Sequence, residues 1–307
     1  MDIGWVILVF VLATVGTAAL GLASKWVDRK VTARIQWRVG PPWYQPLADV
    51  AKLLGKETLV PATARRWTFL MAPVVGFAGI AVAAAILWST NLFRTGFVGD
   101  LIVVVYLFTM PSLAIIMGGL SSGNPVAVLG ASREMKLVFA YELPFILALV
   151  TVIIQAGGTL RLNGVLEHQA AHGMIVGSLS GVIAFAVAIL CGQAKLGLVP
   201  FDIPEAETEI MAGPFTEYSG APLAVFYLMK AVLLATVGVF LITVFWGGIR
   251  EGWPGLWSAA VYVLILTLFV LIRNTNPRLR IDQAVKFFWF GLTPIAIVGV
   301  VLAVLGL

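Results

Sequence analysis

The stretch LAVFYLMKAVLLATVGVFLITVFW, residues 223–246, holds a single charged side chain, Lys230, among 24 residues. The hydrocarbon core of a bilayer is about 30 Å thick, and a helix needs about 20 apolar residues to cross it. The stretch is long and apolar enough to do so, and it therefore predicts a membrane-spanning helix.

The rest of the chain has the same character. Of its 307 residues, 60% belong to the AVILMFWYC set and only 11% are charged, whereas about 25% is usual for a soluble domain. A soluble fold of this size would need far more charge to cover its surface, so we expect an integral membrane protein with nearly all its mass in lipid. This composition excludes a disordered chain, a secreted disulfide scaffold and a soluble enzyme.

Eight segments meet the length requirement and predict an all-α polytopic fold, a single membrane domain over residues 1–307 with no soluble domain left over. Glycine and proline separate the segments. They are residues 3–22, 68–88, 101–120, 137–154, 175–196, 223–246, 256–272 and 285–305. Nothing basic precedes the first segment, and it is too long for the apolar region of a signal peptide, so we expect an uncleaved span.

The basic residues fall mostly on one side of these spans. Of the 20 lysines and arginines, 16 lie in loops or span ends on one side, Arg94, Arg161 and Arg250 lie on the other, and Lys230 lies within a span. Because basic loops stay in the cytoplasm, the pattern predicts the cytoplasmic membrane, with both termini on the non-cytoplasmic side. Membrane topology, rather than nucleic acid binding, then explains the net charge of +5.

Cysteine and histidine are too few to build a redox centre in this chain. The single cysteine, Cys191, can neither form an intramolecular disulfide nor hold an iron–sulfur cluster, and two histidines supply at most one pair of haem ligands. His168 and His172 are four residues apart, but no third metal ligand is evident beside them, and we take them as ordinary loop residues. We therefore expect no metal or cofactor in this chain and place any redox cofactor on a partner subunit.

The long loop after the first span joins a proline-rich turn, Arg38–Pro46, to an amphipathic segment ending at Glu57. Four apolar residues of this segment recur at helical spacing opposite three charged ones: Leu47, Val50, Leu53 and Leu54 against Asp49, Lys52 and Lys56. This spacing predicts a short helix on the membrane surface. Its apolar face could anchor it in lipid, but the rigid turn before it favours a docking surface.

The connection PFDIPEAETEIMAGPFTEY, residues 200–218 and called the acidic loop here, is rich in carboxylates. Asp202 with Glu205 three residues later is typical of a capping box, so we expect a helix to begin here with Glu205 and Glu209 on one face. Six acids then face one nearby lysine, Lys195; they are Asp202, Glu205, Glu207, Glu209, Glu217 and Glu142. A solvated acidic face is one explanation. Like charges in a partly buried site raise one another's pKa, however, which suits groups that exchange protons.

Two charged residues are expected inside the membrane, Glu142 in the fourth span and Lys230 in the sixth. A carboxylate at that depth costs about 2.5–3.5 kcal/mol on insertion scales, so it should find a cation, face water or be protonated. The opposite charges suggest that Glu142 and Lys230 pair with each other, and an ion pair that opens and closes can transfer protons. Alternatively, both side chains snorkel towards the membrane surface.

A series of motifs, ordered along most of the chain, resembles one known family. The motifs are RVGPP (38–42), QPLADVAKLLGKE (45–57), Arg133 with AYE (140–142), PFDIPEAETE (200–209) with EY (217–218), and RNTNPRLRIDQ (273–283). Together with the eight spans, they resemble a membrane subunit family of respiratory complex I, designated by the letter H in bacteria and called subunit one in mitochondria.

This resemblance implies a place at the heel of an L-shaped complex, where the membrane arm meets the peripheral redox arm. The cytoplasmic loops would frame a cavity beneath the terminal iron–sulfur cluster of a neighbouring subunit. The cavity entrance and docking face would be formed by Arg38, Asp49, Lys52 and Glu57. The acidic funnel would be formed by Glu142, Glu205, Glu207, Glu209 and Glu217, and the braces of the loops by Arg133, Arg278, Arg280 and Asp282.

Two departures from the complex I pattern bear on the substrate. The complex I form usually carries an extra stretch between its Arg-x-Gly-Pro and Gln-Pro elements, but here Pro42–Tyr44 connects them directly. The family also often has a glutamate where this chain has Lys230. With the acidic loop, both features look more like the membrane-bound NiFe-hydrogenase branch and its sulfur-reducing relatives, which reoxidise ferredoxin. Because that branch needs no quinone, the resemblance gives no support for a quinone site.

The leading hypothesis is a membrane-anchor and energy-coupling subunit with no catalytic centre of its own. It would hold hydrogenase-like large and small peripheral subunits, which carry iron–sulfur clusters and in a hydrogenase a NiFe centre. Through Asp202, Lys230 and the acidic funnel it would relay redox changes to antiporter-like subunits that move H⁺ or Na⁺. One alternative is the quinone-binding subunit of an NADH:quinone oxidoreductase. Another is a stand-alone secondary transporter, which should contain two repeated halves with broken helices; the sequence has no such repeat.

Overall fold

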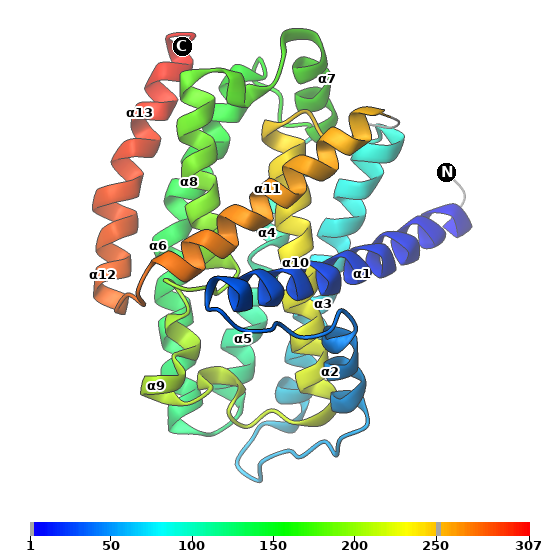
Figure 1. Cartoon of the computed structure of the whole chain (residues 1–307), viewed down its shortest axis with the longest axis vertical. Coiled ribbons are helices and arrows are strands. Elements are labelled where there is room, and N and C mark those ends of the chain that lie inside the picture. Colours follow the sequence, from blue (N-terminus) through cyan, green and yellow to red (C-terminus); the bar gives the residue numbers. More distant parts are fainter. Residues whose placement is uncertain (1–2, 250–252) are drawn as a thin grey trace.

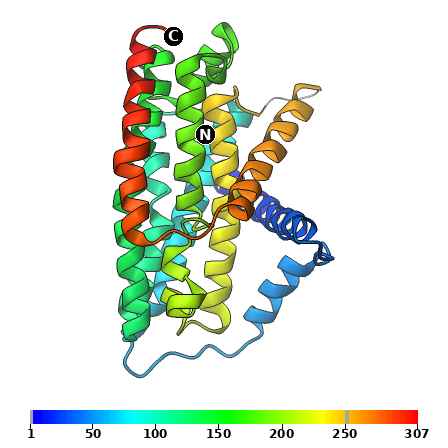
Figure 2. The same ribbon diagram turned by 60° about the vertical axis from the view of Figure 1, so that its left-hand side comes forward.

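The computed structural model describes residues 3–249 and 253–307, without the side chains of Glu207, Thr208, Trp253 and Pro254. Arg250, one of the basic residues used to assign the topology, lies outside these ranges. All the regular secondary structure described is helical (Figures 1 and 2). The α-helices are α1 (Ile3–Ile35), α2 (Gln45–Leu54), α3 (Arg66–Phe93), α4 (Asp100–Leu107), α5 (Met110–Ser121), α6 (Pro125–Gln155), α7 (Leu162–His172), α8 (Leu179–Lys195), α9 (Glu207–Ile210), α10 (Gly220–Phe245), α11 (Trp253–Thr275), α12 (Ile281–Lys286) and α13 (Thr293–Val304). Short 3₁₀ turns are η1 (Ile175–Gly177), η2 (Ile203–Glu205) and η3 (Gly213–Phe215), and a π-helical turn is η4 (Phe287–Leu292).

Each of the eight expected spans contains a helix. In the described part of the chain, seven helical segments are long and apolar enough to cross a membrane. The eighth, α8, is apolar but shorter, with 17 residues, or about 26 Å at 1.5 Å per residue. The prediction of an all-α polytopic membrane protein is confirmed.

Two helices extend well beyond their predicted spans. α1 continues to Ile35 rather than ending near residue 22, and α6 begins at Pro125 rather than near residue 137. The apolar stretches end where charges begin, but a charge does not end a helix. Arg29 of α1 has a carboxylate partner, and the Asn124 side chain caps α6 by accepting a hydrogen bond from the Val126 N–H at 2.8 Å.

The third and eighth spans are each interrupted. Pro111 at the start of α5 has no N–H to continue the hydrogen bonding of α4, so the two helices are separate, and the Thr109 hydroxyl donates to the Tyr106 carbonyl at 2.7 Å. In the last span, Pro294 similarly follows η4, where the helix widens before α13 begins. Interruptions of this kind are tolerated in membranes where the freed backbone groups lie within protein.

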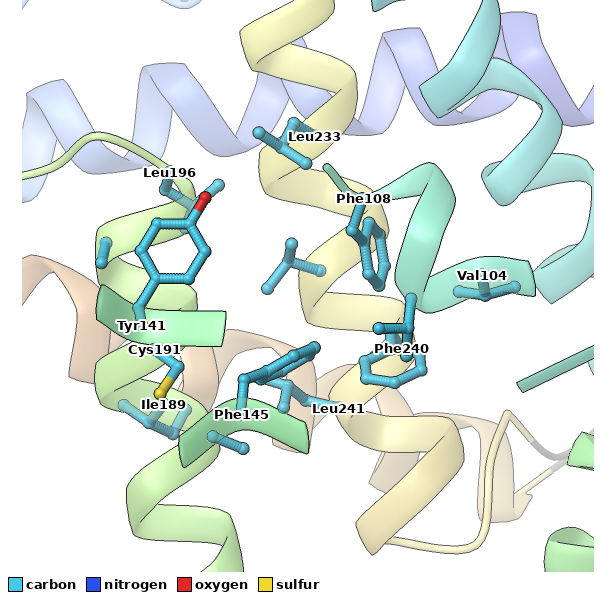
Figure 3. Packing of buried hydrophobic residues seen from close by; sticks show 14 of the residues in the cluster. Val104, Phe108, Tyr141, Phe145, Ile189, Cys191, Leu196, Leu233, Phe240 and Leu241 are labelled. Atoms are coloured by element: carbon cyan, nitrogen blue, oxygen red, sulfur yellow. The ribbon is translucent and has the colours of Figure 1, made fainter. Parts of the chain in front are cut away.

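The helix α10 forms the centre of the bundle, and every residue from Ala231 to Phe245 is buried. On one side it packs with α6 and α8 around aromatic residues, of which Phe145, Phe240 and Tyr141 are labelled in Figure 3. The helices α1 and α11 cross α10 obliquely on another side (Figures 1 and 2). Because few residues of α1 are buried, most of its surface remains for lipid or for a partner.

The crossing of α1 and α10 depends on a close approach at Gly21. A Cβ atom at this position would lie 2.2 Å from the Ala231 carbonyl oxygen, which belongs to the backbone of α10. Gly16, one turn and a half earlier on the same helix, faces open space with nothing within 4 Å of its would-be Cβ. The two glycines therefore offer a matched comparison.

We expect Gly21→Val to destabilise the fold by about 1–3 kcal/mol, because the side chain would force the two backbones apart. The buried thiol of Cys191, the single cysteine, reports the loss of structure when it reacts with a thiol-specific fluorogenic dye on heating. Gly21→Val should lower the midpoint of this transition and Gly16→Val should leave it nearly unchanged. Equal midpoints for the two variants would contradict the close approach.

Candidate functional site

A cavity of about 270 Å³ lies between α1, α10, the segment after α8 and the end of α11. Eight of its 13 lining residues are charged: Lys25, Asp28, Arg29, Asp202, Glu205, Lys230, Arg273 and Arg278. Charges of both signs thus converge from four segments that are distant in the sequence. We call this space the charged cavity.

Ion pairs hold the walls of the charged cavity together. Lys230 of α10 donates from Nζ to Oε1 of Glu205, and Arg273 of α11 pairs with Asp28 of α1. Arg278 bridges to Asp202 with 2.8 Å between Nη2 and Oδ2. Each pair joins two different elements, so the charges fix the positions of the acidic loop and of α1 against the bundle.

A second buried pair lies deeper in the bundle. Nζ of Lys195, at the end of α8, donates to Oε2 of Glu142 on α6 at 2.7 Å. The side chain of Lys195 is only 1% exposed, and its ammonium group also lies 4.8 Å and 4.6 Å from the ring centres of Tyr141 and Phe145. Such a desolvated cation is stabilised both by the carboxylate and by the aromatic faces.

The predicted pairing of Glu142 with Lys230 is wrong. Glu142 pairs with Lys195, and Lys230 pairs with Glu205 while lying 4.6 Å from the ring centre of Phe215. The sequence placed the two residues in the membrane but could not show which cations and anions face each other. Lys195 lies in the last turn of α8 and can reach α6, a contact that spacing along one helix does not reveal.

The predicted helix with a capping box at Asp202 is also wrong. The chain forms the single 3₁₀ turn η2, and Asp202 makes no side-chain capping bond. The short helix α9 begins only at Glu207, so Glu205 and Glu209 do not share a helical face. Glu205 turns to Lys230, whereas Glu209 pairs with Arg133 at 2.6 Å. The Arg278–Asp202 pair takes the carboxylate that would have capped the helix.

Asp202 is a carboxylate of the acidic loop whose pKa is disturbed by its surroundings. Burial raises its pKa above the ordinary value, and the negative charge of Glu205 acts in the same direction. Arg278 opposes this rise but does not overcome it. One Asp202 oxygen, Oδ1, has no hydrogen-bond partner. A carboxyl group in this position responds readily to a change in nearby charge.

The other residues singled out from the sequence lie outside the charged cavity. Glu217 accepts a hydrogen bond from Asn124 at 2.5 Å, and the Glu207 side chain is not described. Five are exposed and do not line the charged cavity: Arg38, Lys52, Glu57, Arg280 and Asp282. The backbone N–H of Arg280 donates to Gln283 at the start of α12. His168 and His172 lie on α7 rather than in a loop, with their rings stacked 4.4 Å apart.

The amphipathic segment forms the predicted helix, α2. It lies beside α1 and α10, near the end of the molecule that also carries α9 (Figure 1). Asp49 accepts hydrogen bonds from Arg29 of α1 at 2.8 Å and from Gln45 at 2.9 Å, and Arg29 also donates to the Tyr227 hydroxyl. Leu47 and Leu54 remain exposed on the other face.

Sequence reasoning missed five charged residues of this region: Lys25, Asp28, Arg29 and Arg273, which line the charged cavity, and Glu134 in the interior of α6. Lys25 lines the charged cavity and lies 4.5 Å from the ring centre of Tyr227, because α1 continues past the end of its predicted span. Glu134 is 6% exposed in the interior of α6. It stood outside the span predicted from residue 137, but its neighbours in the motif that includes Arg133 could have drawn attention to it.

An apolar groove of about 570 Å³ runs along α4, α5 and α6. Glu142 is the only charged residue among the 15 that line it, all of which belong to the described part of the chain. Glu142 therefore connects the buried pair with Lys195 to a surface at the depth of the membrane. The charged groups extend from the charged cavity, through Glu205 and Lys230, to the region of Lys195 and this groove.

Comparison with known proteins agrees with this arrangement. The family model described as NADH dehydrogenase matches residues 6–304. The chain belongs to this family. The resemblance to the H-type membrane subunit of complex I, first seen in the sequence motifs, is thereby confirmed.

Among curated relatives, the H-type NADH-quinone oxidoreductase subunit of Thermomicrobium roseum is 38% identical, over 92% of this chain and 90% of the relative. The second H-type NADH-quinone oxidoreductase subunit of Syntrophobacter fumaroxidans is 33% identical, over 97% and 95% of the two chains. Among solved structures, a chain of the membrane-bound sulfane sulfur reductase, an archaeal respiratory membrane complex, superposes with a TM-score of 0.87. It is 29% identical, and the match covers 97% of this chain and 99% of that one.

The Arg29–Asp49 pair predicts a pH-dependent docking of α2. Partial burial tends to raise the pKa of Asp49, but the hydrogen bonds from Arg29 and Gln45 outweigh it and lower the pKa below its ordinary value. A lowered carboxylate pKa gives stability that is present above the unfolded-state value of about 3.9. This stability is lost as the pH falls through the lowered value.

We expect Asp49→Asn to speed hydrogen exchange of the α2 backbone by up to about fivefold at neutral pH, since a partly exposed pair contributes about 1 kcal/mol or less. The difference from the unsubstituted chain should shrink as the pH falls through the lowered pKa of Asp49. Lys56→Gln, which changes an exposed charge just beyond α2, is the control. A difference that persists unchanged in acid would show that the ion pair does not hold α2.

Proposed function

We propose that this chain is the membrane-anchor and energy-coupling subunit of a complex I-like respiratory complex in the cytoplasmic membrane. It holds the redox arm on the side of α2 and the acidic loop, and it passes the effect of electron transfer to ion-translocating membrane subunits. Both termini then lie on the non-cytoplasmic side, as the distribution of lysine and arginine predicts.

One observation carries this proposal. Buried and half-buried charges lead from the charged cavity, which Asp202, Glu205 and Lys230 line, to the Lys195–Glu142 pair and the apolar groove. Charged groups inside a membrane protein are expensive and generally mark ion or proton pathways. A protein that only anchored its partners would have no need for them at that depth.

The mechanism that this geometry favours is electrostatic. An iron–sulfur cluster of the docked arm would supply a change in charge beside the cavity. In this chain, Asp202 and Glu205 respond by changing their protonation or their pairing with Arg278 and Lys230. A shift of one pKa unit in one carboxylate corresponds to about 1.4 kcal/mol, so several coupled groups supply a useful bias. A membrane partner bound in the groove beside Glu142 would sense this electrostatic bias.

The walls of the charged cavity favour partners like those of the hydrogenase and sulfur-reductase branch over a quinone. A quinone needs apolar walls for its isoprenoid tail, but eight of the 13 cavity-lining residues are charged and most are held in ion pairs. The match to a chain of the sulfane sulfur reductase complex over nearly its full length supports the same branch. The partners would then be hydrogenase-like large and small subunits, with iron–sulfur clusters, and antiporter-like membrane subunits.

Copurification tests the proposal directly. We expect the full chain, tagged and extracted in mild detergent from its native membrane, to bring with it subunits that contain iron–sulfur clusters and polytopic membrane subunits. Analysis of the purified complex for nickel and for flavin separates the branches, and inhibition by quinone analogues would favour the quinone-binding alternative. A chain that purifies alone and transports ions alone would refute the subunit proposal in favour of a secondary transporter.

We expect Glu142→Gln and Lys230→Met each to reduce ion translocation by about tenfold or more, since each removes a charged group from the proposed path. Membrane vesicles containing the complex report translocation through a potential-sensitive dye, which responds to either H⁺ or Na⁺. The rate of electron transfer, measured in the same vesicles with an uncoupler, should fall much less. Full ion translocation in both variants would contradict the proposed relay through Glu142 and Lys230.

Glu167→Gln is the matched control, because it makes the same chemical change as Glu142→Gln on α7, outside the charged path. There the Glu167 carboxylate accepts a hydrogen bond from Asn163 at 2.6 Å. The complex that contains Glu167→Gln should translocate ions at the same rate as the unsubstituted complex. An equal loss in the control would assign the effect to a general disturbance of the fold.

A further inference from the structure

Glu134 lies near two ion pairs, Lys195–Glu142 and Lys230–Glu205. It projects from α6 into a cavity of about 10 Å³ that is also lined by Lys195, Glu205, Lys230 and Ser112. A space of that size holds about one water molecule. Residues of both pairs therefore line the same small cavity as Glu134, which is itself 6% exposed.

The charges around this cavity do not balance if every group is ionised. Lys230 is bound to Glu205 and Lys195 is bound to Glu142, so each lysine already neutralises one carboxylate. Among the described residues, Glu134 takes part in no ion pair. The groups that face it are Ser112 from α5, Tyr141 from α6, Lys195 from α8, Glu205 from η2 and Lys230 from α10.

A buried carboxylate without its own cation is strongly disfavoured, whereas a neutral carboxylic acid at the same place is not. The two lysines cannot serve Glu134 without abandoning Glu205 or Glu142. The same reasoning makes Glu134 the natural third partner when either pair opens, because both ammonium groups border its cavity. Glu134 can therefore interact with the lysine of either pair, Lys230 or Lys195, and so connect the two pairs.

We propose that Glu134 carries a proton in the structure described here and is the residue through which the Glu205–Lys230 pair and the Lys195–Glu142 pair exchange charge. This inference rests on the proposed function and names the residue that connects its two halves. Glu134 acts by direct proton exchange with its neighbours rather than by holding the helices together.

The exchange conserves both protons and charge. Lys195 gives a proton to the Glu142 carboxylate and takes one from the Glu134 carboxylic acid, so that one proton moves from Glu134 to Glu142 and Lys195 remains an ammonium ion. The resulting Glu134 carboxylate attracts Lys230, which leaves Glu205. Glu205 can then take a proton from the charged cavity, and the return of Lys230 to Glu205 requires that this proton pass to Glu134. Glu142 releases its proton on the side of the apolar groove and pairs again with Lys195, so one proton enters at Glu205 and one leaves at Glu142 in each cycle. No oxidant or reductant is needed for any of these steps.

Infrared spectroscopy of the full chain in detergent tests whether Glu134 carries the proton. The spectrum of the unsubstituted chain minus that of Glu134→Gln, at neutral pH, should contain the carbonyl stretch of one protonated carboxylic acid, and this band should shift in D₂O. The matched difference for Glu167→Gln, which alters a carboxyl group outside the cavity, should lack it. Absence of the band from the Glu134 difference would overturn the proposal whatever the complex transports.

Ion translocation by the assembled complex tests the exchange itself. Glu134→Gln should assemble with its partners and transfer electrons, but translocate at least about tenfold fewer ions per electron. Glu134→Asp, which keeps an ionisable group, should recover part of the loss, and a purely structural role would not produce this difference. Translocation by Glu134→Gln equal to that of the unsubstituted complex would overturn the proposal.

These experiments distinguish a failure of the proposed function from a failure of the proposed role of Glu134. If the unsubstituted complex translocates no ions, the proposed function is wrong, and the infrared band still reports the protonation of Glu134. If the unsubstituted complex translocates ions and Glu142→Gln abolishes this while Glu134→Gln does not, the proposed function stands and the connecting role of Glu134 is wrong.

Discussion

The constraint on which the structure depends is that a charge inside a helical bundle in lipid must be neutralised where it lies. Lys195, which is only 1% exposed, shows the consequence most clearly, since a carboxylate and two aromatic rings surround its ammonium group. Lys230 has a similar environment, formed by Glu205 and the ring of Phe215. Removing one partner from such a pair leaves an uncompensated buried charge and costs about 3–5 kcal/mol. The ion pairs are therefore strongly held in place. Protons and pairing partners can be exchanged between them only where a further ionisable group lies nearby.

The packing of the helices provides the space that this exchange needs. The α10 helix is buried from Ala231 to Phe245, but its first half borders the charged cavity because α1 and α11 cross it obliquely instead of lying parallel to it (Figure 2). Gly21 allows the backbones of α1 and α10 to meet, and this contact brings the later, charged turns of α1 to the cavity wall. The crossing of α1 over α10 thus has two results. One half of α10 is closely packed among apolar residues, and the other half lies beside the charged cavity.

The sequence predicted the elements of this protein better than their contacts. Apolar length indicated eight helical segments, seven of which are long enough in the described chain to cross a membrane, and the periodicity of Leu47 to Leu54 indicated α2, because both depend on residues close together in the chain. The partners of Glu142 and Lys230 depend instead on which helix faces which, and spacing along the chain carries no such information. Asp202 follows the same rule: a local capping pattern predicted a helix, and an ion pair with the distant Arg278 prevails. Glu134 was missed because hydropathy ends a span at the first charges, although α6 continues through them.

The presence of lysines at the two central positions has a consequence for how such a path could work. A row of carboxylates alone would repel one another, and several of them would have to remain protonated to coexist in a bundle. With Lys195 and Lys230 between them, Glu142 and Glu205 can both stay ionised, and Glu134 is the described carboxyl group of the small cavity that is left without a cation of its own. One mobile proton then suffices to change the state of the whole group. The transfer from Glu134 to Glu142 through Lys195 leaves the net charge of the group unchanged, so this step moves no net charge into the lipid, which would be costly in a bilayer.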